Sequence, residues 1–100
     1  MQDLLITPKE LKDALKKNNN IQLVDVRTLD KHLAYNIGGL HIPLEELLVR
    51  LKELNPELPV VTYCTVGGKS MVALNILRAS GFKSVKSLDG GMTAWQIDCA

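Results

Sequence analysis

The apolar positions of this chain fall into short runs and longer periodic stretches that alternate from one end to the other. Short runs of β-branched and other aliphatic residues predict strands, and they lie at residues 21–26, 40–42, 59–63 and 82–88. Helical spacing or a helix start signal predicts helices over residues 8–17, 28–35, 43–51, 70–80 and 92–97. Because strands alternate with helices, we expect an α/β fold with a mainly parallel sheet and helices on both faces.

Two of these helices carry clear boundary signals. Thr7 and Glu10 have the spacing of a capping box at the start of the first helix. The asparagines at residues 18–20 predict its end. Gly81 stands where the helix over residues 70–80 needs its C-cap.

Composition narrows the classes of protein. One hundred residues predict one domain, and 46% hydrophobic with only 4% aromatic residues is typical of an aliphatic α/β core. The formal net charge is +1, with both signs interspersed, so no nucleic acid partner is expected. No stretch approaches the roughly 18 apolar residues of a membrane helix, so no membrane partner is expected either.

The N-terminus and the cysteines point to a reducing compartment. The first ten residues lack the basic and apolar regions of a signal peptide, so we expect a cytoplasmic protein. Cys64 and Cys99 are too few for a disulfide framework or a metal site, and nothing in the sequence calls for a metal or a cofactor. Cys99 is interpreted as an incidental thiol.

The polar loop after the third predicted strand holds the candidate chemistry. Cys64 follows that strand directly, at the carboxyl edge where open α/β sheets bind ligands. Gly67 and Gly68 allow successive N–H groups to turn inward as an anion nest, and the helix N-terminus adds positive potential. Lys69 adds a full positive charge, which favours the thiolate and attracts anions. A thiol in this place is therefore expected to ionise more readily than free cysteine.

Several other polar residues have plain structural explanations. Asp25 and Arg27 end a predicted strand at the same edge as the loop cysteine, and we interpret them as a structural ion pair that supports neighbouring loops. Ser70 fits a helix-start residue and a hydroxyl donor to sulfur equally well. His32 and His41 lack the spacing of a metal site, so we interpret both as ordinary surface or half-buried residues.

Three segments together resemble the rhodanese family of sulfurtransferases, and the resemblance covers nearly the whole chain. They are LVDVRT at residues 23–28, CTVGGKS at 64–70 and LDGGMTAW at 88–95. The resemblance implies a single rhodanese domain over residues 1–100. It also implies a three-layer sandwich around a mostly parallel, five-stranded sheet.

The resemblance further implies sulfurtransferase chemistry on the loop. Cys64 would be catalytic: it would take a sulfane sulfur from thiosulfate or a protein persulfide and pass it to a thiophilic acceptor. Asp25 and Arg27 would support this site. The residues that would bind the substrate or the persulfide are Thr65, Val66, Gly67, Gly68, Lys69 and Ser70.

Two positions depart from the usual family pattern. Lys69 stands where Arg is more common, and Arg binds oxyanions through a bidentate fork whereas Lys is a point charge. Asn36 stands where many members have His, in a segment about one residue short, which we interpret as a subtype. Rhodanese domains are often parts of larger proteins, including adenylating enzymes that load sulfur carriers, so a fusion or association of that kind remains an alternative.

Two other function classes compete with an enzyme that transfers sulfur. A regulatory or binding module of rhodanese type usually lacks the loop cysteine, which is present here. Related phosphatases and arsenate reductases need five residues between Cys and Arg, whereas four separate Cys64 from Lys69. The shorter loop favours a sulfur atom over a tetrahedral oxyanion.

Overall fold

The chain folds around one parallel sheet. The computed structural model describes residues 4–17 and 20–99, so the predicted helix end at residues 18–19 lies outside the described residues. Five strands pair in the order β1-β5-β4-β2-β3, and every described pair is parallel. Their bounds are β1 Leu5–Ile6, β2 Gln22–Asp25, β3 Leu40–His41, β4 Val60–Tyr63 and β5 Val85–Leu88.

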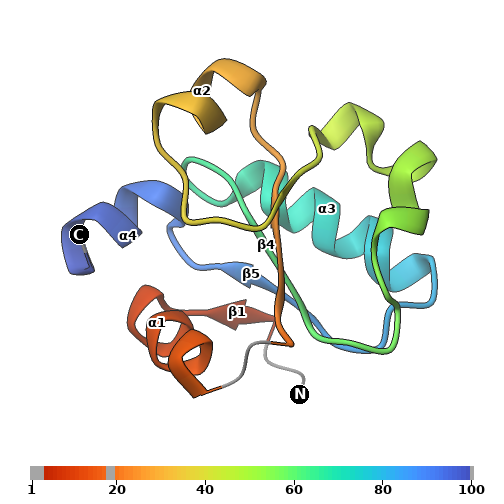
Figure 1. The fold of residues 1–100 in the computed structure, drawn as a ribbon, viewed down its shortest axis with the longest axis horizontal. Coiled ribbons are helices and arrows are strands. Elements are labelled where there is room, and N and C mark those ends of the chain that lie inside the picture. Colours follow the sequence, from red (N-terminus) through yellow and green to blue (C-terminus); the bar gives the residue numbers. More distant parts are fainter. Residues whose placement is uncertain (1–3, 18–19, 100) are drawn as a thin grey trace.

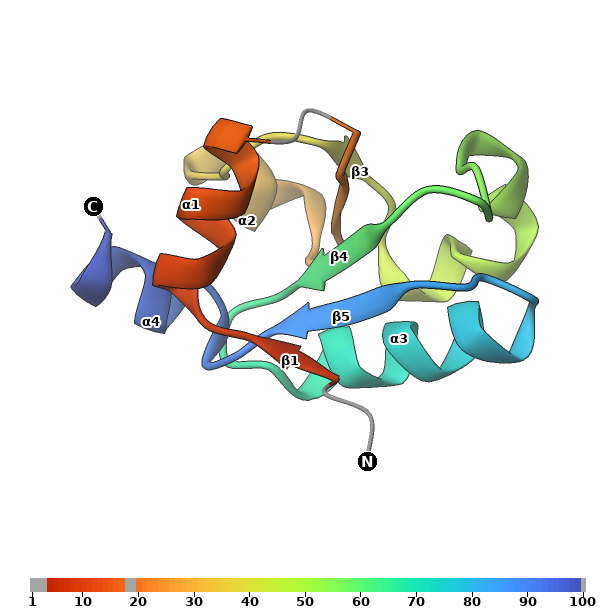
Figure 2. The same ribbon diagram turned by 90° about the horizontal axis from the view of Figure 1, so that it is seen from below.

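Helices cover both faces of this sheet, as the sequence predicts. Figure 2 shows α3 on one side of the strands and α1 with α4 on the other. The helices are α1 Pro8–Lys17, α2 Leu29–Ala34, α3 Gly68–Ala79 and α4 Gly91–Asp98, and two 3-10 segments are η1 Leu44–Glu46 and η2 Leu48–Glu53. The predicted α/β class and the five-stranded, parallel, three-layer architecture are thereby confirmed.

Each face of the sheet buries its own hydrophobic cluster. Beneath α3, the fully buried Leu74 and Leu77 pack with sheet residues such as Val24. On the opposite face, Leu11 of α1 and Trp95 of α4 pack in one cluster. The capping box at the start of α1 forms as expected: the Glu10 N–H donates to Thr7 Oγ1 at 3.1 Å, and the Thr7 N–H donates to Glu10 Oε1 at 2.9 Å.

One strand was missed by the local pattern, and one local prediction was wrong. No strand was predicted at β1, which is only two residues long and pairs with β5 at a distant place in the sequence. The helix predicted over residues 43–51 is instead the two 3-10 segments, with Arg50 in a non-helical conformation at φ −115°. The backbone hydrogen bonds show the second difference: the N–H groups of Leu47 and Arg50 donate three residues back, to the carbonyls of Leu44 and Leu47, at 3.2 and 3.1 Å.

The register of the sheet sets up the candidate site. Asp25 of β2 pairs with Tyr63 of β4, so the residues that follow, including Cys64, emerge side by side at the carboxyl edge. The helix α2 lies at this edge and has no buried residue of its own (Figure 1). Within the described residues, no helix is long and apolar enough to cross a membrane.

Candidate active site

The loop between β4 and α3 wraps around the sulfur of Cys64. Gly67 is the N-cap of α3 and has a φ of +113°, a left-handed conformation that L side chains rarely adopt. This turn aims backbone donors at Sγ: the Gly67 N–H lies 3.1 Å from it and the Ser70 N–H 3.3 Å. The sulfur therefore lies in a cradle of amides at a helix N-terminus.

The same contacts decide the ionisation of Cys64. The residue is only 3% exposed, and this burial acts to raise the pKa of the thiol. Hydrogen bonds from the Ser70 side chain and from the N–H groups of Ser70, Gly67 and Val66 outweigh burial, so the pKa lies below its ordinary value. The cause of the lowering is hydrogen bonding by the loop, which the glycine nest in the sequence predicts, and not the charge of Lys69, which the sequence also invoked.

The start of α4 holds the base of the loop in place. The Met92 N–H donates to the Cys64 carbonyl at 2.8 Å, and the Thr93 N–H donates to the Thr65 carbonyl at 3.0 Å. Gly91 makes this approach possible, because a Cβ there would stand 2.4 Å from the Cys64 carbonyl oxygen. The glycines of the LDGGMTAW segment thus fix the backbone that carries Cys64.

Asp25 and Arg27 form a buried ion pair beside the loop. Arg27 Nε and Nη2 donate to the two carboxylate oxygens of Asp25 at 2.9 and 2.8 Å, and Nη2 also donates to the Tyr35 carbonyl at 2.6 Å. Burial acts to raise the pKa of Asp25, but the bonds from Arg27 prevail and lower it. The pair ties β2 to the segment that follows α2, as the structural interpretation of these residues expects.

The two histidines were underestimated by sequence reasoning. His32 Nδ1 lies 2.8 Å from Asp25 Oδ2, and His41 Nε2 lies 2.8 Å from the Arg27 carbonyl oxygen. Their rings stack with centroids 4.5 Å apart. Both therefore support the Asp25–Arg27 pair, a role that no spacing in the sequence signals because the four residues meet only in the fold.

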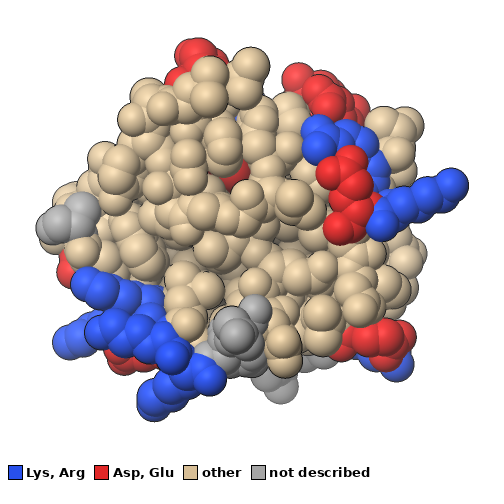
Figure 3. All heavy atoms as spheres, viewed as in Figure 1, with Lys and Arg blue, Asp and Glu red and all other residues tan. Residues whose placement is uncertain are grey.

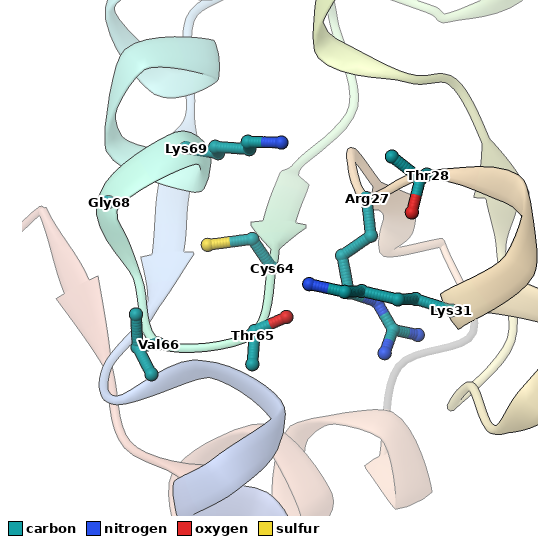
Figure 4. A pocket seen from close by; sticks show the side chains of 8 residues that line it. All are labelled: Arg27, Thr28, Lys31, Cys64, Thr65, Val66, Gly68 and Lys69. Carbon is teal, nitrogen blue, oxygen red and sulfur yellow. The ribbon is translucent and has the colours of Figure 1, made fainter.

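A pocket of about 290 Å³ opens above the Cys64 sulfur. It is lined by Arg27, Thr28, Lys31, Cys64, Thr65, Val66, Gly68 and Lys69. Figure 4 shows Lys69 from α3 and Lys31 from α2 reaching into this pocket from opposite sides. Lys31 was missed in the sequence, where it reads as one exposed lysine on a short helix.

The predicted site residues separate into layers around this pocket. Thr65, Val66, Gly68 and Lys69 line it, and Val66 is 68% exposed at its rim. Ser70 is fully buried beneath the sulfur. Asp25 lies behind Arg27, outside the lining.

The face of the molecule drawn in Figure 3 carries its charges over other elements than the pocket does. Figure 3 shows lysine side chains gathered over α1, whose Lys9, Lys12 and Lys16 are exposed. Over the 3-10 segments, acidic and basic groups lie together, and Arg50 pairs there with Glu46 at 3.0 Å. The two lysines of the pocket belong to neither group and lie on α2 and α3. In the described part of the chain, no three His, Cys, Asp or Glu side chains gather as a metal site requires.

Comparisons with known proteins find relatives in both sequence and structure. The chain is 35% identical to the adenylyltransferase and sulfurtransferase MOCS3 of Arabidopsis thaliana over 90% of its own length, but it spans only 23% of that protein. It is 34% identical to the thiosulfate sulfurtransferase GlpE of Coxiella burnetii, covering 82% of this chain and 78% of that one. A rhodanese-like domain protein from Staphylococcus aureus superposes with a TM-score of 0.85 at 30% identity, covering 93% and 91% of the two chains. The family model described as Rhodanese-like domain matches residues 7–98, and the chain belongs to this family.

Proposed function

We propose that this protein is a sulfurtransferase that carries a sulfane sulfur on Cys64 as a persulfide. The observation that carries the proposal is the cradle around Sγ, in which the N–H groups of Gly67 and Ser70 lie at 3.1 and 3.3 Å. These donors stabilise the thiolate that attacks. The presence of this cysteine, cradled in this way, argues against a purely regulatory module.

The reaction divides into two displacements at sulfur. The Cys64 thiolate attacks the sulfane sulfur of the donor, and a new S–S bond forms. With thiosulfate, the bond from the sulfane sulfur to the sulfonate breaks, and sulfite leaves with the electron pair. A thiol or cyanide acceptor, as its anion, then attacks the outer sulfur, and Cys64 leaves as the thiolate that began the cycle.

The loop is suited to hold the anionic outer sulfur. The first N–H groups of a helix have no intrahelical acceptor, and those of Gly68 and Lys69 are at the start of α3. The outer sulfur would accept hydrogen bonds from them. A phosphoryl group has three more oxygens to seat, and the four-residue spacing between Cys64 and Lys69 leaves too little room for it.

The pocket supports a small anionic donor such as thiosulfate. Lys31 and Lys69 place two ammonium groups at its rim, and its volume is about 290 Å³. Neither lysine offers the planar fork of an arginine, so the donor would be held by charge rather than by a bidentate fit. A protein persulfide is the alternative donor, and the exposed Val66 at the rim favours contact with such a partner.

We also propose a setting for the reaction. The match to a MOCS3 protein, of which this chain spans 23%, supports action together with, or fused to, an enzyme that activates a sulfur carrier. A second relative, a putative sulfur carrier protein from Bacillus subtilis, is 30% identical and points the same way. A cytoplasmic location fits the two free cysteines, since that compartment keeps thiols reduced.

Intact-protein mass spectrometry tests the reaction class. After incubation with thiosulfate, the wild type should gain the mass of one sulfur atom, and cyanide should remove it. Cys64→Ser should show no gain, while the matched Cys99→Ser variant should gain as the wild type does. Equal loss in both variants would point to a relay of two thiols. Cys64-dependent turnover of an aryl phosphate would instead support the phosphatase alternative.

A further inference from the structure

A pair of buried hydroxyl groups lies directly beneath the nucleophile. Ser70 of α3 and Ser87 of β5 are both fully buried, and their Oγ atoms lie 2.6 Å apart. Ser70 Oγ in turn lies 3.4 Å from the sulfur of Cys64. The mechanism described above uses Ser70 but assigns nothing to Ser87, which is seventeen residues away in the sequence.

The number of available protons decides which of the two serines donates the hydrogen bond between them. Ser70 Oγ has three polar neighbours: the Cys64 sulfur at 3.4 Å, the Gly67 carbonyl at 3.1 Å and Ser87 Oγ at 2.6 Å. Its one proton can be donated to only one of them. The Ser87 hydroxyl, by contrast, has Ser70 Oγ as its hydrogen-bond partner among the described residues. Because a buried hydroxyl without an acceptor is unfavourable, Ser87 donates and Ser70 accepts.

We propose that Ser87 is a positioning residue: by donating to Ser70 Oγ, it keeps the Ser70 hydroxyl proton available to the Cys64 sulfur. The proposal rests on the proposed role of Cys64 as the nucleophile. While Cys64 is a thiol, its S–H donates to Ser70 Oγ, and the Ser70 proton goes to the Gly67 carbonyl. When the thiol loses its proton to solvent, the Ser70 hydroxyl turns and donates to the thiolate. Ser87 donates to Ser70 in both states, and neither serine gives up its proton.

This arrangement strengthens the hydrogen bond that the thiolate accepts from the Ser70 hydroxyl. A donor that is itself an acceptor from a second hydroxyl is polarised, and chains of this kind reinforce one another in a dry interior. Bonds to an ionised group are also stronger than bonds between neutral groups. Removal of the Ser87 hydroxyl should therefore destabilise the thiolate more than the thiol.

Alkylation of Cys64 as a function of pH tests this directly. The rate with iodoacetamide is measured in a Cys99→Ser background, so that one thiol reports. Ser87→Ala should raise the pH midpoint by about half a unit to one unit, since the effect is a fraction of one charged hydrogen bond. Ser87→Thr keeps the hydroxyl on the same carbon and should restore the midpoint of the parent.

A double-variant comparison separates positioning from general loosening. In a Ser70→Ala background, Ser87→Ala should cause no further shift, because its effect passes through the Ser70 hydroxyl. Thr62→Val is the matched control: its buried hydroxyl donates to the Ser70 backbone carbonyl at 2.8 Å and touches no sulfur. It should lower thermal stability and leave the midpoint unchanged.

Three results would overturn the proposal: an unshifted midpoint in Ser87→Ala, the same shift with and without the Ser70 hydroxyl, or an equal shift in Thr62→Val. Alkylation reports the thiolate whether or not the protein transfers sulfur. A protein that shows the predicted shifts but gains no sulfur from any donor would retain the Ser87 assignment and lose the proposed function.

Discussion

Gly91 should tolerate no side chain, because the backbone of Cys64 lies against it. Its φ is +59°, and a Cβ there would stand 2.4 Å from the Cys64 carbonyl oxygen, where ordinary contact begins at 3.4 Å. The two backbones are joined by the bonds from Met92 to Cys64 and from Thr93 to Thr65, at 2.8 and 3.0 Å. An alanine at position 91 would have to push them apart and stretch both bonds.

These observations give a magnitude for Gly91→Ala. The left-handed conformation costs an L residue about 1–2 kcal/mol. Each weakened backbone hydrogen bond adds about 0.5–1.5 kcal/mol, so the free energy of unfolding should fall by about 2–5 kcal/mol in all. In a domain of this size, that loss corresponds to a decrease in Tm of about 10 °C or more.

Two other glycines provide matched controls in the same assay, urea and thermal unfolding followed by circular dichroism. Gly81 has a φ of +94° but open space around a Cβ, so Gly81→Ala should lose only the conformational part, about 1–2 kcal/mol. Gly68 lies at the start of α3 with open space and no positive φ, so Gly68→Ala should be neutral or stabilising. If Gly91→Ala lost no more than Gly81→Ala, the close approach to Cys64 would be energetically irrelevant and the reasoning refuted.

Two further predictions concern charge. Lys31→Ala and Lys69→Ala should each lower kcat/KM with thiosulfate about fivefold, mainly through KM, since an ammonium near water contributes about 1 kcal/mol. Lys69→Arg should equal or exceed the wild type, and added salt should reduce the differences between the variants. If the control Lys9→Ala lowered kcat/KM as much, the effect would not be local to the pocket. Because the pKa of Asp25 is lowered in the fold, the ionised carboxylate stabilises the protein at pH values above its ordinary pKa of 3.8. This stabilisation is lost as the pH falls through the lower pKa of the folded state. Asp25→Asn should therefore lower the free energy of unfolding at neutral pH by about 3–5 kcal/mol, because Arg27 is left unpaired. In urea titrations at acid pH, the free energy of unfolding of this variant should depend less steeply on pH than that of the wild type. An equal slope would contradict the assignment.

Local signals predicted the local structure well. The capping box of Thr7 and Glu10 formed as expected because both partners lie within one turn of the same helix. The loop that begins at Cys64 could also be predicted, since a strand, two glycines and a helix start follow one another directly in the chain. The α/β class followed from the alternation of strands and helices, and it is confirmed.

Features that depend on distant partners could not be predicted in this way. The two residues of β1 show no period, and they form a strand only because β5 pairs with them across the fold. The 3-10 geometry of residues 44–53 could not be read from the leucines, because their spacing fits an α-helix face equally well.

The candidate site shows the same division. The order of residues by itself predicted the candidate nucleophile Cys64 and its glycine-rich cradle, because these residues are neighbours in the chain, and it carried the family resemblance. Tertiary structure alone decided that Lys31 faces Lys69, that His32 bonds to Asp25 and that Ser87 lies beneath Ser70. Those contacts join different strands and helices, and their energies depend on burial and distance, which a linear sequence does not specify until the sheet register is set.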